Sequence, residues 1–237
     1  MRKRARSENP HLAKGLTILY EDREILVVDK PSGLLTVGAD SGKSLTAYSI
    51  LTNYIRKGSP RSRNRVFIVH RLDRDTSGVL LFAKTEEAKT RLQSQWDETR
   101  KKYLAVVHGT CRKKSDTIST YLAENKAQVV YSTSDPAQGK LSHTAYQVLR
   151  QTKYHALLEV DLLTGRKNQI RVHLAGIGHP IVGDRKYGRA DDNHPHLALH
   201  AQTIVFKHPQ SGEELMFSAK VPGYFAKLVG NFECSFT

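Results

Sequence analysis

The sequence predicts an α+β fold in which helices and loops flank a mixed, mostly antiparallel central sheet. Short apolar runs rich in Val, Ile and Leu recur along the chain, and polar or Gly/Pro turns separate them. Only a few segments carry apolar residues at helical spacing. No linker or internal repeat divides the 237 residues, so we expect one domain over residues 16–237, preceded by a basic and flexible arm over residues 1–15.

In the first half of the chain, two strands are predicted to open the fold. Leu16–Tyr20 and Glu24–Val28 are β-type runs joined by a polar turn, and the Pro31–Gly33 segment ends the second run. The other elements expected in this half are a helix capped by Ser44 and ending at Lys57, a strand over Val66–Val69, a strand over Val79–Ala83, and a helix capped by Thr85 and ending near Trp96.

In the second half, strands dominate. The predicted strands are Tyr103–Val107, Thr144–Leu149, Ala156–Leu162, Leu197–Phe206 and Glu214–Ser218. The main exception is a short helix over Lys167–Ile177, where Ile170, Leu174 and Ile177 fall on one face and Gly178 ends the helix. Arg171 follows Ile170, so it lies beside the buried face and can point toward a site.

Charge is the most informative feature of the composition. Thirty-seven Lys and Arg against 23 Asp and Glu give a formal net charge of +14, and the cations form several clusters along the chain. A polyanion such as RNA is the natural partner of such a chain. No apolar run is long enough to cross a membrane, and no secretion signal is apparent. We therefore expect a cytoplasmic protein, and no long apolar face indicates an oligomer.

Several familiar chemistries are not supported. The Gly38–Ser44 segment resembles a phosphate-binding loop but has one residue too few between its glycines. His194, His196 and His200 lie close together in the sequence, yet the spacing of a known zinc motif is absent. Two isolated cysteines form neither a disulfide framework nor a CxxC site. We therefore expect neither a metal nor a cofactor.

The densest polar segment, residues 70–78, lies between two predicted strands, where functional loops are often built. Asp73 has Arg71 and Arg74 as sequence neighbours, and nearby cations favour an ionised carboxylate. Such a carboxylate can act as a nucleophile or a base. The same residues can also form a structural ion-pair cluster that braces a turn, and composition alone does not separate the two interpretations.

Several motifs in order resemble the RluA-type RNA pseudouridine synthases. The sequence HRLD at 70–73 followed by TSG at 76–78 resembles the family's element around its essential aspartate. The segment KKYLAVV at 101–107 resembles a second element, and TGRKNQIRVH at 164–173 resembles a third, in which Asn168 replaces the usual histidine. GHPIVGD at 178–184, LHA at 199–201 and HP at 208–209 are similar to further landmarks. The resemblance covers about residues 16–222.

This resemblance implies a pseudouridine synthase fold and the isomerisation of uridine to pseudouridine in rRNA or tRNA, without a cofactor or a metal. Asp73 matches the catalytic carboxylate, which either attacks C1′ or removes the C2′ proton. Arg171 matches the basic residue that pairs with this aspartate, and Tyr103 matches the tyrosine that lines the site and stacks on the base. The target nucleotide must be flipped out of its helix.

RNA contacts are expected from the catalytic domain itself. Arg71 is the candidate for filling the space that the flipped nucleotide leaves, because a guanidinium can stack on bases and bind phosphate at once. The full set of expected RNA-binding residues is Arg71, Arg74, Thr76, Arg166 and Leu174.

Two other functions remain open on the sequence alone. One is a catalytically silent RNA-binding or ribosome-assembly factor with the same fold. The second is a metal-dependent nuclease built on Asp73, Asp75 and the histidines. Tritium release from C5-labelled uridine in RNA separates the isomerase from the silent factor, and resistance of activity to a chelator excludes the nuclease.

Overall fold

The computed structural model describes residue 12 and residues 15–38, 45–59 and 61–232. Most of the expected basic arm, the Ser44 cap and the 39–44 part of the glycine-containing turn lie outside these residues. The helices are α1 (Ala47–Ile55), α2 (Glu86–Ser94), the 3₁₀ turn η1 (Trp96–Glu98), α3 (Gln169–Gly176) and α4 (Gly223–Val229). None of the helices in the described ranges is long and apolar enough to cross a membrane.

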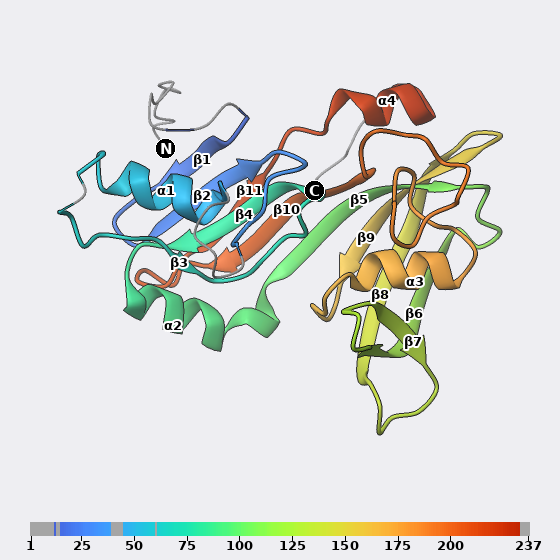
Figure 1. Ribbon diagram of the computed structural model, residues 1–237, viewed down its shortest axis with the longest axis horizontal. Coiled ribbons are helices and arrows are strands. Elements are labelled where there is room, and N and C mark those ends of the chain that lie inside the picture. The colour runs from blue at the N-terminus through green and yellow to red at the C-terminus, as the bar shows by residue number, and fades with distance from the viewer. Residues whose placement is uncertain (1–11, 13–14, 39–44, 60, 233–237) are drawn as a thin grey trace.

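The strands of the described residues form one sheet of 11 strands, drawn in Figure 1. They are β1 (Thr17–Glu21), β2 (Ile25–Lys30), β3 (Phe67–Ile68), β4 (Ser77–Ala83), β5 (Arg100–His108), β6 (Ser115–Glu124), β7 (Val130–Thr133), β8 (Lys140–Gln151), β9 (His155–Leu162), β10 (Leu199–Lys207) and β11 (Glu214–Ser218). Their order is β1-β2-β4-β10-β5-β9-β8-β6-β7, with β11 on β10 and β3 on β4. Among these pairs only β10 and β4 run parallel, so the predicted mixed, mostly antiparallel α+β sheet is confirmed.

Strand β5 links two halves of the molecule in Figure 1. One half contains β1, β2, β4, β10 and β11 with α1 and α2, and the other contains β9, β8, β6 and β7 with α3 and α4. Because β5 pairs with β10 on one side and β9 on the other, the halves share one continuous sheet.

The central strand β4 is buried on both faces. Leu80 and Phe82 pack in the cluster that includes Leu51 of α1, whereas Val79 and Leu81 pack with Ala88 and Leu92 of α2. A strand that is covered on both faces has a continuous run of apolar residues in its sequence, and residues 79–83 show this pattern. Burial of this kind stabilises by about 1.5–3 kcal/mol per large side chain.

The bounds of several predicted elements differ from the structure. The strand expected over Val66–Val69 is only the two residues of β3. Helix α1 begins after Thr46, whose hydroxyl accepts from the Ser49 N–H in a capping box. Ile177, expected on the buried face of its helix, lies beyond the end of α3 and is 40% exposed.

Three elements were not predicted at all: β6, β7 and α4. In β6 only Ile118 and Leu122 are buried, so the strand lacks a clear apolar alternation. Helix α4 has seven residues and begins directly after Pro222 with a glycine, a start that reads as a turn in the sequence.

Candidate active site

The loop between β3 and β4, residues 69–76, enters the sheet where β4 and β10 run parallel. Ser77 pairs with His200 and Gly78 with Ala201 in this short parallel register. Gly78 has φ of +114°, and a Cβ at this position would lie 2.1 Å from the Ala201 carbonyl oxygen. Only glycine therefore allows the two strands to approach at the end of the loop.

A buried lysine holds this loop from the end of β2. Lys30 is fully buried, and its Nζ donates to the carbonyl oxygens of Pro31 at 3.0 Å, Leu34 at 2.7 Å and Arg74 at 3.0 Å. The ammonium group thus finds three acceptors in place of water. Burial lowers the pKa of Lys30 to about 8, although Asp75, Asp73 and Asp29 act in the opposite direction.

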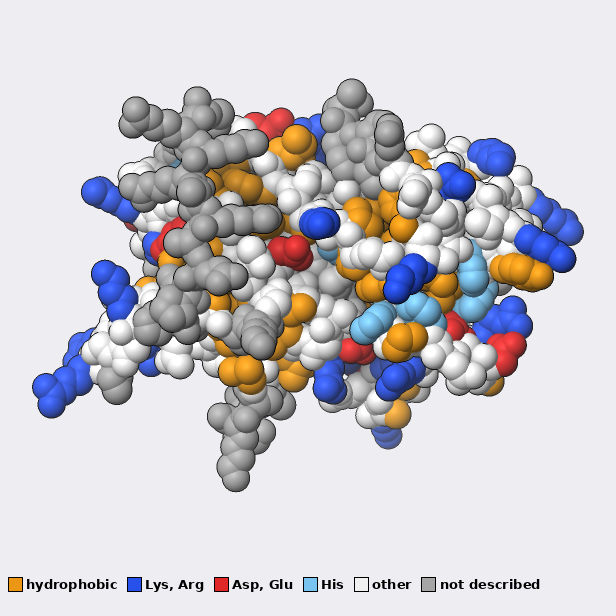
Figure 2. Space-filling view, turned by 90° about the horizontal axis from the view of Figure 1, so that it is seen from above, with side chains coloured by type: hydrophobic (Ala, Val, Ile, Leu, Met, Phe, Trp, Pro, Cys, Tyr) orange, Lys and Arg blue, Asp and Glu red, His pale blue; other side chains and the backbone are white. Residues whose placement is uncertain are grey.

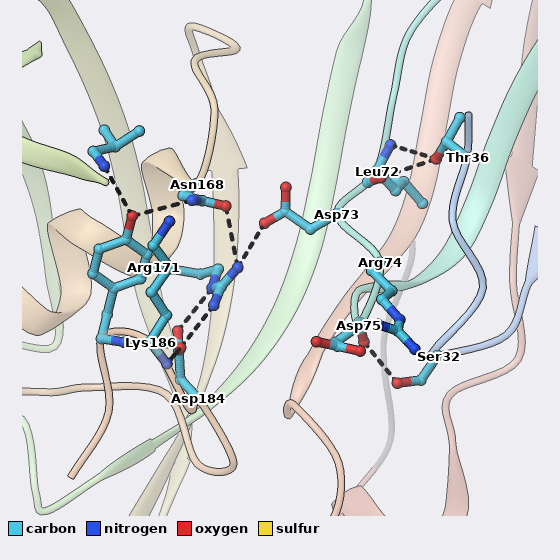
Figure 3. A network of polar contacts seen from close by, with 12 residues as sticks. Ser32, Thr36, Leu72, Asp73, Arg74, Asp75, Asn168, Arg171, Asp184 and Lys186 are labelled. Carbon is cyan, nitrogen blue, oxygen red and sulfur yellow. Dashed lines mark hydrogen bonds and ion pairs between the residues drawn. The ribbon is translucent and has the colours of Figure 1, made fainter. Parts of the chain in front are cut away.

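Side chains of the segment after β2 fix the rest of the loop (Figure 3). The Thr36 hydroxyl donates to the Leu72 carbonyl at 2.9 Å and accepts from the Leu72 N–H at 3.2 Å. The Ser32 hydroxyl donates to the Asp75 carbonyl at 2.8 Å. Together with Lys30, these bonds hold the backbone on both sides of Asp73.

At the start of the loop, His70 acts as a structural acceptor. Its Nε2 accepts from the Leu81 N–H at 3.0 Å, and its ring centroid lies 4.8 Å from that of Trp96. Burial, and secondly the charge of Lys101, lower the pKa of His70 to about 3. The imidazole is therefore neutral at neutral pH, as this hydrogen bond requires.

The Asp73 carboxylate faces α3. Its Oδ2 accepts from Nη1 of Arg171 at 3.0 Å, and its side chain remains 29% exposed while that of Arg171 is only 11% exposed. The ion partner of Asp73 is thus Arg171, 98 residues away, and not the sequence neighbours Arg71 and Arg74. Among the described residues, no hydrogen bond is formed by Oδ1 of Asp73, which leaves that oxygen available to a ligand.

Arg171 is itself held by a second acid, Asp184. The guanidinium donates to both oxygens of Asp184, through Nε at 2.8 Å and Nη2 at 2.7 Å. Burial by itself would lower the pKa of Arg171, but Asp184 and Asp73 outweigh burial and raise it, so the group stays charged. A bidentate pair of this kind fixes the orientation as well as the charge of the guanidinium.

Asp184 is completely enclosed. Its side chain has no exposed surface, and it also accepts from the N–H groups of Lys186 at 2.9 Å and Tyr187 at 3.0 Å. Burial would raise the pKa of this carboxyl, but the hydrogen bonds and charge of Arg171 and the two N–H groups hold the pKa below its ordinary value. The site therefore contains one partly exposed and one enclosed carboxylate on a single arginine.

Asn168, at the N-cap of α3, completes the arrangement. It has φ of 55°, a left-handed conformation that asparagine tolerates better than most residues. Its Oδ1 accepts from Nη1 of Arg171 at 3.1 Å, and its Nδ2 donates to the Tyr187 hydroxyl at 3.1 Å. The Tyr187 ring lies 5.2 Å from the Arg171 guanidinium carbon. The departure from the family's usual histidine therefore lies in direct contact with Arg171.

Buried polar side chains anchor α3 on β8. Gln169 donates to the His143 carbonyl and the Thr144 hydroxyl, both at 2.9 Å, and accepts from the Arg166 N–H at 3.0 Å. His173 bonds Thr144 through Nδ1 at 2.9 Å and Thr120 through Nε2 at 3.0 Å. Gln169 and His173 lie four residues apart on one face of α3, so this face is held on the sheet and the helix presents Arg171 to the loop from a fixed position.

Tyr103 lies in β5, next to β10. It is 8% exposed, and it pairs with Val160 of β9 and Ala201 of β10. Burial, and secondly the negative charge of Asp73, raise the pKa of Tyr103, so the phenol remains protonated at neutral pH. The structure therefore brings Tyr103 into the electrostatic range of Asp73.

The predicted RNA-binding residues divide into two groups. Arg71, Arg74 and Arg166 are exposed, and their RNA contacts stay a prediction. Leu174 and Thr76 are 0% and 2% exposed, so their side chains are inaccessible in this structure, and their RNA contact also stays a prediction. Leu174 packs in the core beneath α3, and Thr76 lies at the buried start of β4.

Sequence reasoning missed four residues of this site: Lys30, Asn168 as a ligand of Arg171, Asp184 and Tyr187. Asp184 is the last residue of the GHPIVGD motif. Its role as the ion partner of Arg171 depends on a contact between residues 13 positions apart, which the motif does not reveal. The only signal for Lys30 was its position between an apolar strand and a Pro-Ser-Gly turn.

The histidines do not form a metal site in the described part of the chain. His200 is buried and bonds Ser77 through Nδ1 at 2.8 Å. His196 instead packs on Tyr224, with ring centroids 5.1 Å apart, and His194 lies 5.6 Å from the same ring. No group of three or more potential ligands converges within the described ranges.

Comparison with known proteins agrees with this geometry. The family model described as RNA pseudouridylate synthase matches residues 24–176. An uncharacterised RNA pseudouridine synthase of Mycoplasma genitalium is 34% identical over 229 residues, which cover 94% of this chain and 72% of that protein. The ribosomal large subunit pseudouridine synthase C of Buchnera aphidicola subsp. Schizaphis graminum is 36% identical over 88% of this chain and 68% of its own length.

Solved structures of RNA pseudouridylate synthase domains also share this fold. Human RNA pseudouridylate synthase domain containing 4 superimposes with a TM-score of 0.73 at 25% identity, covering 88% of this chain and 90% of that one. Human RNA pseudouridylate synthase domain containing 1 gives 0.73 at 26% identity, over 91% and 86%. The shared sheet, the motif matches and the extent of these similarities establish that the chain belongs to the RNA pseudouridylate synthase family.

Proposed function

We propose that Asp73 is the catalytic carboxylate with which this RNA pseudouridine synthase isomerises uridine in structured ribosomal RNA. The observation that carries the proposal is the carboxylate itself. It is oriented by Arg171 at 3.0 Å and remains 29% exposed. Ribosomal RNA is favoured over transfer RNA by the relative in Buchnera and by one in Nitrosomonas europaea, which is 35% identical over 228 residues and is named ribosomal large subunit pseudouridine synthase D.

The reaction needs no net gain or loss of atoms. The N1–C1′ bond of uridine breaks, the uracil turns, and a C5–C1′ bond forms. C5 then loses its proton, and N1 carries one in the product. Asp73 either attacks C1′ or removes the C2′ proton, and its free Oδ1 suits both roles. Arg171 keeps the carboxylate in place with a charge-assisted hydrogen bond.

Access to the uridine requires base flipping, which costs a few kcal/mol. Arg71, exposed in the same loop as Asp73, would enter the space that the nucleotide leaves. Tyr103 would stack on the flipped base and assist the late removal of the C5 proton, which passes to solvent water because the protonated phenol cannot itself accept it. Arg74 and Arg166 would contact phosphates. We further propose that residues 16–237 act as one cytoplasmic, monomeric catalytic domain without a cofactor, in line with the continuous sheet.

The decisive experiment measures tritium release from RNA that carries [5-³H]uridine. Wild-type protein should release tritium from the RNA of a strain lacking the gene, and Asp73→Asn should reduce release to background while RNA binding persists. Asp75→Asn is the matched control, because this exposed carboxylate lies two residues away and should leave release nearly unchanged. Equal activity of wild type and Asp73→Asn would refute the proposal.

The substrate assignment has its own test. Pseudouridines would be mapped across ribosomal and transfer RNA from cells with and without the gene. Loss of one or more positions in large-subunit ribosomal RNA is the expected result. Loss confined to transfer RNA would overturn the ribosomal assignment and leave the role of Asp73 intact.

A further inference from the structure

A cationic groove lies at the opposite end of β4 from the Asp73 loop. It has a volume of about 570 Å³ and lies between the end of α1, the segment leading into β3 and the turn before α2. The side chains that define it are Arg56, Arg63, Arg65, Phe67, Lys84 and Glu86. In Figure 2, Lys and Arg side chains project from the end of the molecule at which Figure 1 places α1 and the segment that follows it.

The arginines of this groove are not neutralised by the protein. Within the described residues, Arg63 and Arg65 form no ion pair, and Arg56 donates its Nε to the Asn64 carbonyl at 2.9 Å. By contrast, Lys84 is paired with Glu21 at 2.7 Å. Glu86 is the only acidic residue among the described lining residues. The groove therefore presents excess positive charge to an anion.

Two lining side chains also suit a nucleotide base. The guanidinium carbon of Arg65 lies 5.0 Å from the centroid of the Phe67 ring, so a planar cation covers an aromatic face. Phe67 is held in β3, where it pairs with Ala83 of β4. Bases of unpaired RNA stack on aromatic rings and on guanidinium planes. Because Arg65 covers this face of Phe67, a base would stack on the outer side of its guanidinium, beside the phosphate contacts.

Strand β4 sets the distance between this groove and the catalytic loop. Ser77 follows the loop, and Lys84 follows the last residue of β4. Seven strand residues at about 3.3 Å each place the groove about 20 Å from the loop. This distance corresponds to about six nucleotides of a stacked strand at ~3.4 Å per nucleotide.

We propose that the groove binds the backbone of the substrate RNA about six nucleotides from the uridine that reacts. The groove adds affinity for RNA at a distance from the reacting uridine, and it binds the strand through the charge of its phosphates. The inference rests on RNA being the substrate of this enzyme, and it does not depend on which residue performs catalysis.

The test removes the two unpaired guanidinium groups in Arg63→Gln/Arg65→Gln. Affinity for a fluorescein-labelled oligouridylate of about 16 nucleotides, the upper end of the site size of one OB fold, would be measured by anisotropy at several salt concentrations. The slope of log K against log salt should become shallower by about 1.4, because each phosphate contact on a single strand contributes about 0.7. With natural RNA the KM should rise, while kcat stays at the wild-type value.

Three controls make the result specific. Lys153→Gln/Lys227→Gln removes two exposed charges elsewhere and should leave the slope unchanged, and Arg63→Lys/Arg65→Lys should retain the wild-type slope. Asp73→Asn should keep the slope and lose turnover, which separates this inference from the role of Asp73. An unchanged slope in the Gln variant, or the same decrease in the Lys153/Lys227 variant, would overturn the proposal.

Discussion

The central residue is Arg171, which connects the enclosed carboxylate of Asp184 to the partly exposed carboxylate of Asp73. A lone Asp73 would be free to rotate, whereas a guanidinium fixed on Asp184 offers it a single direction of approach. The planar fork of arginine makes these bonds at the same time, and a lysine ammonium on a flexible stem does not.

Arg171→Lys should therefore retain the positive charge and lose activity. The loss of the directed bond to Asp73 should lower kcat by about 10- to 100-fold, since a charge-assisted hydrogen bond contributes about 1.5–3 kcal/mol. The check is single-turnover tritium release at saturating RNA, with thermal unfolding to confirm that the variant is folded. Wild-type kcat in a folded Arg171→Lys protein would contradict the proposed positioning.

Lys30 should give the protein a distinct stability profile at alkaline pH. Its pKa is about 8 in the folded chain and about 10.4 when exposed. Between these values the unfolded chain binds a proton that the folded chain does not. The free energy of unfolding therefore increases as pH rises. The gain is complete above the unfolded value and is lost as pH falls through about 8.

The measurement compares urea unfolding of wild type with Lys30→Met from about pH 7 to about pH 10. The free energy of unfolding of wild type, relative to that of Lys30→Met, should increase by roughly 3 kcal/mol over this range. The variant also leaves three carbonyl groups without their donor and should be less stable throughout. A difference that does not change with pH would show that Lys30 does not titrate in this window.

At the scale of elements, the site depends on the close approach of β4 and β10. Gly78→Ala would place a methyl group 2.1 Å from the Ala201 carbonyl oxygen at a φ of +114°. We expect a loss of unfolding free energy of about 3 kcal/mol or more, and a lower kcat because the Asp73 loop shifts. Gly223→Ala, where a Cβ meets nothing within 4 Å, is the matched control for unfolding and kinetics. Equal stability of the two variants would contradict this account.

The predictability of the elements follows from how each one is buried. The apolar runs of β2, β4 and β9 mark central strands, and the Thr85 cap marks α2, so these elements could be predicted from the sequence alone. The β6–β7 hairpin could not, because its outer face is polar and its pairing with β8 is a tertiary contact.

For the site, the motif at residues 70–78 predicted the loop that carries Asp73, and the separate motif at 164–173 predicted Arg171 as its partner. The sequence did not show that Arg74 donates to the Gly33 carbonyl, while Asp73 pairs with Arg171. Helical spacing predicts one buried face, but only the packed structure shows which residue reaches the loop. Lys30 was missed because lysine is rarely buried without an acidic partner.

At the scale of the whole molecule, three histidines stay neutral in the folded chain at neutral pH. Burial lowers the pKa of His173 and of His200 to about 4, and that of His70 to about 3. The unfolded chain takes up these protons below about pH 6.5. The contribution of these histidines to the free energy of unfolding is therefore fully present above their unfolded pKa of about 6.5 and declines as pH falls toward 4.

Urea unfolding at about pH 7 and about pH 5 should show this decline. Each histidine contributes up to about 2 kcal/mol over that interval. His200→Leu removes one of the three and should flatten the dependence by that amount, even if the variant is less stable at both pH values. A pH dependence identical to that of wild type would exclude a role for His200.

The parallel pairing of β4 with β10 has a consequence for synthesis on the ribosome. Ser77 pairs with His200, 123 positions later in the chain. The Asp73 loop therefore cannot pack against β10 until β10 has emerged from the exit tunnel. Contacts of such large sequence separation form slowly. We therefore expect a nascent polypeptide halted before β10 to contain Asp73, Tyr103 and Arg171 and still be inactive.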